Sequence, residues 1–206
     1  MMLFKNATVV FQGDSITDCG RSGNNAPMGN GYPYFAAHML TAKYPELNLN
    51  FINEGISGNR TKDLVARWDT DTLAHKPDVL TILIGINDTW RKFDSNDPTT
   101  AEEYEANYRN ILTRTRDALP DCKIVMLEPF LMHLGGKEAW REDLNAKILA
   151  CRNLSKEFAD AFIPLDGYFA AACVQQPEEV WTRDGVHPVG AGCALIAEKL
   201  MKVLTK

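Results

Sequence analysis

Val9-Val10-Phe11-Gln12-Gly13-Asp14-Ser15-Ile16-Thr17, near the start of the chain, joins an apolar run to a polar turn. The run from Ala7 to Phe11 has the length and composition of a buried strand, and Gly13 allows the backbone to turn sharply. In an open parallel sheet, Ser15 would lie just past the carboxyl end of that strand, where such sheets bind ligands. Asp14 and Ser15 are equally typical of a helix cap, so this stretch alone supports both a functional and a capping role.

Strand-like and helix-like segments alternate along the rest of the chain. Residues 78–84 are almost continuously apolar, which is typical of a strand buried on both faces of a parallel sheet. In residues 32–44 the helical spacing of Phe35, Met39 and Ala42 predicts a buried stripe. The predicted strands are 7–11, 47–52, 78–84, 122–127 and 162–165, and the predicted helices are 32–44, one beginning near Thr61, 101–119, 137–159, 166–174 and 189–204.

This alternation predicts one domain over residues 1–206 with an α/β fold. We expect a three-layer α/β/α sandwich with about five parallel strands and right-handed crossovers. The predicted strand order is the flavodoxin-like 2-1-3-4-5.

Composition restricts the classes of partner. The 206 residues include 45% hydrophobic and 24% charged residues, which is ordinary for a globular protein. The net charge of -5 disfavours nucleic acid and other polyanions. The first residues lack the features of a signal peptide, and no apolar run is long enough to cross a bilayer. The five cysteines form no C-x-x-C pair, which predicts free thiols and a cytoplasmic location, with no membrane partner.

Three predicted strands end in polar loops that contain glycine, and a fourth such loop precedes the last helix. The carboxyl ends of parallel strands share one edge of the sheet, so we expect the first three loops to converge. The four loops are Gly13-Asp14-Ser15, Gly55-Ile56-Ser57-Gly58-Asn59, Gly85-Ile86-Asn87-Asp88 and Asp184-Gly185-Val186-His187.

Together the four loops contain the parts of a serine hydrolase. A serine hydroxyl needs a base at neutral pH, and His187 lies three residues after Asp184, which could orient its ring. The backbone N–H groups of Ser15 and Gly58 and the side-chain amide of Asn87 are candidate oxyanion donors. If Gly58 donates through its backbone, we expect a side chain there to be more damaging than one at Gly55.

Each of these residues also has a purely structural interpretation. Asp184 could cap a helix and His187 could lie on the surface. Asn87 could be a turn residue, and Gly58 an ordinary loop glycine. The joint occurrence of all four in order favours the catalytic interpretation.

The four loops resemble, in order and spacing, the sequence blocks of the SGNH (GDSL-type) hydrolase family. The resemblance extends from about Ala7 to the last helix. It implies Ser15 as nucleophile, Asp184 and His187 as its triad partners, and Ser15, Gly58 and Asn87 as oxyanion donors. The chain does not resemble the nucleophile elbow of α/β-hydrolases, because Thr17 stands where that motif has its second glycine.

A closer resemblance is to the intracellular bacterial acetylxylan esterases of this family. Residues 13–21, 55–59 with 63–68, and 84–91 carry it, whereas residues 94–180 are less similar. The resemblance implies removal of acetyl groups from xylo-oligosaccharides through an acyl-enzyme intermediate, a small acetylated saccharide as partner, no cofactor or metal, and a large homo-oligomer.

Several residues near the predicted site are candidates for substrate binding. The aromatic side chains of Tyr32, Trp90 and Trp181 could stack on a sugar ring, although packing in the core would explain them as well. Asp14 and Arg91 complete the candidate set.

Other functions remain open at this point. Within the same class, the chain could be a short-chain thioesterase or a lysophospholipase. From other classes, it could be a Mg-dependent aspartyl phosphatase that uses Asp14 with Asp18 and Asp88, or a non-catalytic sugar-binding module.

Overall fold

A five-stranded parallel sheet in the order β2-β1-β3-β4-β5 lies at the centre of the computed structural model, which describes residues 2–206. This confirms the predicted α/β class and strand order. The strands are β1 (Thr8–Gly13), β2 (Asn50–Asn53), β3 (Val79–Leu83), β4 (Lys123–Leu127) and β5 (Ala161–Ile163).

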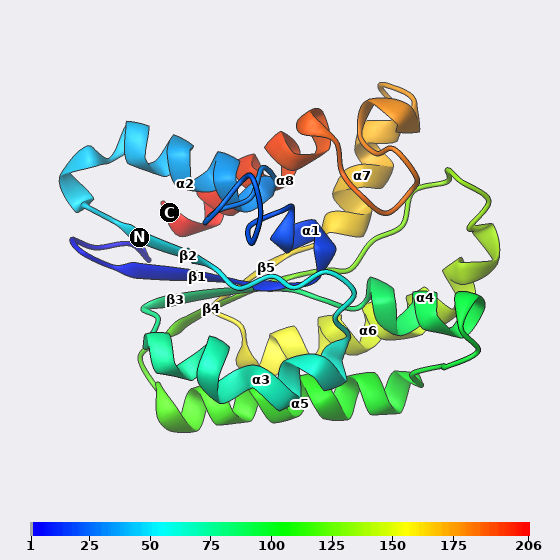
Figure 1. Cartoon of the computed structure of the whole chain (residues 1–206), viewed down its shortest axis with the longest axis horizontal. Coiled ribbons are helices and arrows are strands. Elements are labelled where there is room, and N and C mark those ends of the chain that lie inside the picture. Colours follow the sequence, from blue (N-terminus) through cyan, green and yellow to red (C-terminus); the bar gives the residue numbers. More distant parts are fainter. Residues whose placement is uncertain (1) are drawn as a thin grey trace.

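Helices cover both faces of the sheet and complete the three layers (Figure 1). One layer contains α2 (Tyr32–Lys43), α7 (Leu165–Cys173) and α8 (Gly190–Leu204), and the other contains α3 (Thr61–Asp71), α5 (Ala101–Ala118) and α6 (Arg141–Phe158). Two further helices, α1 (Ser15–Asp18) and α4 (Ile86–Asp94), directly follow β1 and β3 at the carboxyl edge of the sheet. Short 3-10 helices are η1 (Pro45–Leu47), η2 (Leu73–His75), η3 (Glu138–Trp140) and η4 (Glu178–Val180).

Alternate residues of the central strands supply two separate cores. In β1, Val9 and Phe11 pack with residues of α2 and α8, whereas Val10 packs with Leu64 and Trp68 of α3. Successive side chains of a strand point to opposite faces, so a sheet covered on both sides needs apolar residues at every position. The continuous apolar runs in the sequence therefore encode the two helical layers.

The structure corrects three local predictions. β2 begins at Asn50 rather than at residue 47, because Pro45 starts the 3-10 turn η1 and Asn48 has a left-handed φ of 45°. Residues 86–88, predicted to lie in a loop, form the first turn of helix α4. The buried face of α2 includes Tyr32, Ala36 and Leu40, while Met39 is 38% exposed. Alanines in the helix interface weaken the hydrophobic pattern, which explains the wrong choice of face.

The two ends of the described chain meet at the edge of the sheet opposite the carboxyl ends of the strands (Figure 1). The backbone N–H of Met2 donates to the carbonyl of Leu204 at 3.0 Å. All five cysteines are free thiols, as predicted. None of the helices in residues 2–206 combines the length and apolarity needed to cross a bilayer.

Candidate active site

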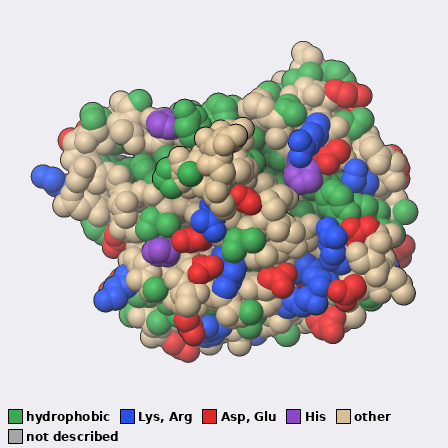
Figure 2. All heavy atoms as spheres, in the orientation of Figure 1, with side chains coloured by type: hydrophobic (Ala, Val, Ile, Leu, Met, Phe, Trp, Pro, Cys, Tyr) green, Lys and Arg blue, Asp and Glu red, His purple; other side chains and the backbone are tan. Residues whose placement is uncertain are grey.

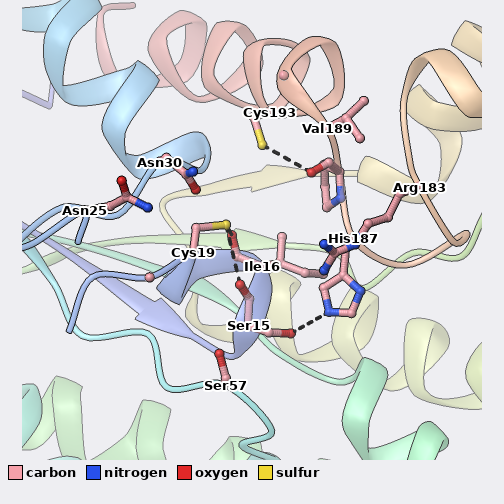
Figure 3. Close-up of a pocket in the computed structure, with 13 residues that line it drawn as sticks. Ser15, Ile16, Cys19, Asn25, Asn30, Ser57, Arg183, His187, Val189 and Cys193 are labelled. Atoms are coloured by element: carbon pink, nitrogen blue, oxygen red, sulfur yellow. Dashed lines mark hydrogen bonds between the residues drawn. The ribbon is translucent and has the colours of Figure 1, made fainter. Parts of the chain in front are cut away.

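Ser15 is the first residue of α1, immediately after the end of β1. The Asp14 carboxylate caps this short helix, since its Oδ1 accepts the Ile16 N–H at 3.0 Å. The Ser15 hydroxyl lies 3.0 Å from Nε2 of His187 (Figure 3). Asp14 therefore takes the capping role, and the Ser15 hydroxyl next to it stays free to interact with the histidine.

The loop that carries His187 is fixed by its own hydrogen bonds. Asp184 Oδ2 lies 2.8 Å from His187 Nδ1, and Oδ1 accepts the backbone N–H groups of Val186 and His187 at 3.0 and 2.8 Å. The Thr182 hydroxyl donates to the His187 carbonyl at 3.0 Å and accepts the Gly185 N–H at 3.0 Å. These bonds leave the imidazole one orientation, with Nε2 facing Ser15.

Asp184 is held in its ionised form. Burial alone would raise the pKa of this carboxyl group, but the hydrogen bonds from His187 and Val186 lower it below its ordinary value. A carboxylate that accepts the Nδ1–H of His187 leaves Nε2 free to accept the Ser15 proton. The three side chains can therefore activate a serine hydroxyl.

The three candidate oxyanion donors follow the adjacent strands β1, β2 and β3. Gly58 has a left-handed φ of 86° in the loop between β2 and α3. Among residues 2–206, the N–H groups of Ser15 and Gly58 donate to no backbone or side-chain acceptor. Asn87 lies in the first turn of α4, and its Nδ2 donates one hydrogen to the Asn59 carbonyl at 3.0 Å. The second amide hydrogen of Asn87 is left for a ligand.

Arg67 of α3 links these segments, a role that no motif in the sequence indicated. Its guanidinium donates to Asn59 Oδ1 at 2.8 Å, to the Glu54 carbonyl at 2.9 Å and to the Gly13 carbonyl at 3.3 Å. An ion pair with Asp71 at 3.1 Å anchors it. One side chain therefore links the end of β1, next to Ser15, to both ends of the loop that contains Gly58.

A cavity of about 520 Å³ opens beside Ser15 and His187. Its walls come from the loop after α1 and from the start of α8 (Figure 3). Cys19 also lines it, but burial raises the pKa of this thiol to about 11, which keeps it protonated and poorly nucleophilic. The other lining residues are Ile16, Gly20, Asn25, Asn30, Ser57, Arg183, Pro188, Val189, Gly190 and Cys193.

Two of the predicted substrate contacts are inaccessible. Tyr32 is fully buried and its hydroxyl lies 3.1 Å from that of Thr17. Asp14 is 1% exposed. Neither side chain can touch a sugar, so the structure does not support a binding role for them. Both residues are buried close to the α1 segment that begins with Ser15.

The other three predicted contacts lie outside the lining of the cavity. Trp90 is closest to the chemistry, with its ring centroid 5.8 Å from that of His187. Arg91 pairs with Asp94 at 2.7 Å and lies over the Trp90 ring. Trp181 is partly buried, and its indole N–H donates to the Gln176 carbonyl at 3.4 Å. Among these three aromatic and charged side chains, Trp90 is the one whose ring lies beside a proposed catalytic side chain.

The acidic residues considered for a phosphatase are engaged elsewhere. Asp18 Oδ2 accepts the Ser57 hydroxyl at 2.6 Å, and Asp88 Oδ1 accepts the Thr61 hydroxyl at 2.6 Å. The Asp14 carboxylate is buried, and burial raises its pKa to about 7 despite the bond from Ile16. A buried carboxylate cannot attack a phosphate ester, so this geometry favours Ser15 over Asp14 as nucleophile.

The surface shows no strong charge asymmetry on the face drawn in Figure 2. Lys and Arg side chains alternate there with Asp and Glu side chains, without an extended area of one sign. A polyanion would need such a basic area, so this face is consistent with a small neutral or singly charged ligand.

The chain is similar to known esterases over nearly its whole length. The sequence model of the GDSL-like lipase/acylhydrolase family matches residues 11–195. An acetylxylan esterase of Geobacillus stearothermophilus is 31% identical over 211 residues, which cover 98% of this chain and 95% of the relative.

Solved structures agree with the sequence match. The crystal structure of that acetylxylan esterase has a TM-score of 0.91 at 31% identity and covers 100% of this chain and 97% of its own. A protein named as a GDSL-like lipase, from Parabacteroides merdae, has a TM-score of 0.92 at 38% identity and covers 98% of this chain and 97% of its own. The chain therefore belongs to the GDSL-like lipase/acylhydrolase family and is a carboxylic ester hydrolase.

Proposed function

We propose that this hydrolase is a serine esterase that removes acetyl groups from carbohydrate esters, with xylo-oligosaccharides as the substrate class. The observation that carries the proposal is the chain of contacts from Ser15 Oγ to His187 Nε2, 3.0 Å, and from His187 Nδ1 to Asp184 Oδ2, 2.8 Å. In the Geobacillus esterase, the catalytic mutants replace a serine, an aspartate and a histidine, and the last two are three positions apart. Asp184 and His187 have the same spacing.

In the acylation step, the Ser15 hydroxyl attacks the acetyl carbonyl carbon while its proton moves to Nε2 of His187. The N–H groups of Ser15 and Gly58 and the Asn87 amide would stabilise the developing oxyanion, each donor contributing about 3–4 kcal/mol. Collapse of the tetrahedral intermediate breaks the ester C–O bond. His187 returns the proton to the departing sugar oxygen, and acetyl-Ser15 remains.

In the deacylation step, water takes the place of Ser15 as the nucleophile, and Ser15 becomes the leaving group. His187 accepts a proton from the water as its oxygen attacks the acetyl-Ser15 carbonyl, and then gives that proton to Ser15 Oγ as acetate leaves. Asp184 stays ionised throughout and holds the imidazolium by its Nδ1–H.

The surroundings of the triad support a carbohydrate leaving group. The cavity is far larger than an acetyl group and is lined by the amides of Asn25 and Asn30 and the hydroxyl of Ser57, which can bond sugar hydroxyls. Trp90 lies beside His187, where an indole could stack on a pyranose ring. The relative with 31% identity acts on acetylxylan, according to its name.

We further propose one catalytic domain over residues 1–206 in a cytoplasmic homo-oligomer. The single sheet with two helical layers supports one domain, and the five free thiols support a reducing compartment. The resemblance to intracellular acetylxylan esterases supports the oligomer, whose size light scattering after gel filtration would measure.

Labelling with an organophosphonate followed by mass spectrometry tests the nucleophile. We expect one adduct, on Ser15, and none in Ser15→Ala. Ser57→Ala, which removes the other serine hydroxyl of the cavity, should still be labelled. Ser15→Ala should melt like the wild type and hydrolyse acetyl esters several orders of magnitude more slowly; retained activity would end the serine mechanism.

The length of the acyl group tests the reaction class. We expect acetyl esters to be hydrolysed with a higher kcat/KM than octanoyl esters of the same alcohol. The opposite order would favour a lysophospholipase-like enzyme, and a preference for acetyl thioesters over acetyl sugars would favour a thioesterase.

A further inference from the structure

Arg183 differs from every other arginine in the protein. The sequence contains ten arginines, and in residues 2–206 all except Arg183 pair with a carboxylate. The paired residues are Arg21, Arg60, Arg67, Arg91, Arg109, Arg114, Arg116, Arg141 and Arg152. The one arginine without a carboxylate partner lines the cavity beside Ser15 and His187.

The position of Arg183 is fixed by the loop that carries the proposed catalytic residues. It directly precedes Asp184, and its backbone N–H donates to the His187 carbonyl at 3.2 Å. Figure 3 shows the side chain extending from this loop towards His187 and Ile16, on the cavity side. Its guanidinium makes no side-chain hydrogen bond to residues 2–206, so its donors are available to a ligand.

No acidic side chain of the cavity is available to neutralise this cation. The cavity lining contains no Asp or Glu. Two acidic residues lie in the loops next to the cavity, and both already accept hydrogen bonds. Asp184 bonds to His187 and Val186, and Asp18 bonds to Ser57 and to the Arg21 N–H. The start of α8, which also lines the cavity, has no acidic residue in its first turn, and its free N–H groups add positive potential.

A guanidinium is a fork of N–H donors that matches the paired oxygens of a carboxylate or a phosphate. The whole chain has a net charge of -5. Inside the cavity, however, the charge of Arg183 has no carboxylate partner, so the local charge attracts an anion. We propose that Arg183 binds an anionic oxygen group on the sugar, so that the substrate class is an acetylated acidic saccharide. This proposal rests on the proposed esterase function and specifies its substrate.

Arg183 also separates this chain from its Geobacillus relative. In that enzyme a tryptophan immediately precedes the catalytic aspartate. A tryptophan offers a stacking surface but no charge, so we expect the two enzymes to differ in their preference for charged sugars.

The test compares kcat/KM for matched acetyl esters. The probes are an acetylated xylo-oligosaccharide, the same compound with a glucuronic acid substituent, an acetylated xylose phosphate, and 4-nitrophenyl acetate as a reference without a sugar. In the wild type we expect at least one anionic probe to exceed the neutral oligosaccharide by about tenfold or more. The two anionic probes distinguish a carboxylate from a phosphate ligand.

The variants Arg183→Gln and Arg183→Trp should lower the ratio of anionic to neutral kcat/KM by about 10- to 100-fold. Arg109→Gln is the matched control, because it removes the same charge from α5, on the opposite side of the sheet from α8; it should leave the ratio unchanged. Added salt should lower the ratio in the wild type and not in Arg183→Gln.

A wild type that hydrolyses the neutral probe as well as both anionic ones would overturn the proposal. So would a ratio that survives both Arg183 substitutions. Failure of the esterase proposal has a different signature, namely no Ser15-dependent hydrolysis of 4-nitrophenyl acetate.

Discussion

At the scale of single residues, Gly55 and Gly58 lie in one loop but meet different surroundings. A Cβ at Gly55 would lie 2.3 Å from the Asp18 nitrogen and 2.7 Å from the Thr17 carbonyl carbon. A Cβ at Gly58 would meet nothing within 4 Å, although the φ of 86° disfavours any side chain. From this geometry we expect the opposite order of sensitivity to the one that the sequence suggested, since an alanine at Gly55 must displace the helix that begins with Ser15.

We therefore predict that Gly55→Ala lowers kcat/KM for an acetyl ester by about 100-fold or more, while Gly58→Ala costs about tenfold or less. The left-handed conformation should cost Gly58→Ala about 1–2 kcal/mol of stability. Kinetics and thermal melts of both variants measure the two effects. A greater loss of kcat/KM in Gly58→Ala than in Gly55→Ala would mean that the loop packs more closely against the substrate at Gly58 than the open space around this glycine suggests.

Asp14 makes stability depend on pH. Burial raises the pKa of its carboxyl group to about 7, against the effect of the Ile16 N–H, and Oδ2 has no hydrogen-bond partner among residues 2–206. The unfolded chain releases this proton near the reference value of about 3.9. Between these pH values the folded state holds the extra proton, so its stability falls as pH rises.

The prediction is that Asp14→Asn is more stable than the wild type at pH 8, by an amount on the order of a few kcal/mol. The difference should shrink towards pH 4, where the wild-type carboxyl group is neutral in both states. Asparagine keeps the acceptor for the Ile16 N–H, so the cap is preserved. Melts of both proteins between pH 4 and 8 measure the difference; parallel curves would show that Asp14 does not titrate in this range.

At the scale of elements, the central strands could be predicted because their apolar runs encode burial on both faces, as in Val79–Leu83. β2 was predicted too early, since the apolar alternation at residues 47–51 continues through the turn that Pro45 imposes. Asn87, which the sequence suggests as an oxyanion donor, was expected on a loop but lies in helix α4, because the first turn of that helix is polar. Sequence patterns locate elements better than they locate their ends.

The roles of Arg67 and Arg183 could not be predicted from the sequence, because they depend on contacts with residues of other elements. Ser15, Asp184 and His187 could be proposed from the sequence because each lies in a short motif. Arg67 bonds to backbone carbonyl groups, which any residue can supply, so no motif marks it. Arg183 stands next to Asp184, yet its significance depends on the carboxylates that pair with the other arginines. Such residues become visible only when distances are known.

Arg67 should act as a positioning residue for the candidate oxyanion donors. We predict that Arg67→Lys lowers kcat by about 10- to 100-fold with little change in KM, because one ammonium group cannot replace a fork that reaches Gly13, Glu54 and Asn59. Steady-state kinetics at several substrate concentrations separates kcat from KM.

Arg114→Lys is the matched control. Arg114 also ties α3 to a neighbouring element, through the Val65 carbonyl at 3.0 Å and Asp69 at 2.6 Å, but it contacts none of the catalytic loops. A merely structural role of Arg67 would make both variants lose stability and keep kcat. An equal kcat for Arg67→Lys and the wild type would contradict the positioning role.

At the scale of the whole molecule, chemistry and stability are located in different parts of one fold. The proposed catalytic residues all lie on loops or helix starts at the carboxyl edge of the sheet, as expected for open parallel sheets. The layer of α3, α5 and α6 contains a separate core with Tyr104 and Tyr108. Substitutions in that core should change stability without changing the reaction, whereas Arg67 of α3 lies outside the core and reaches the carboxyl edge.

Tyr104 and Tyr108 allow this separation to be tested with the same substitution. Both rings are fully buried and meet edge to face, with centroids 5.7 Å apart. The Tyr104 hydroxyl donates to the Ile84 carbonyl at 3.2 Å, whereas the Tyr108 hydroxyl has no partner among residues 2–206. An unpaired buried hydroxyl costs about 1–3 kcal/mol, and a paired one contributes about 1 kcal/mol.

Tyr108→Phe should therefore raise the melting temperature, and Tyr104→Phe should lower it, because the first removes an unpaired polar group and the second leaves a buried carbonyl without its donor. Both variants should keep the kcat and KM of the wild type, since neither hydroxyl bonds to a proposed catalytic residue. Thermal melts and acetyl ester kinetics on the same samples give both readouts. A lower melting temperature for Tyr108→Phe would mean that its hydroxyl is bonded in solution, and altered kinetics in either variant would show that the two layers are coupled.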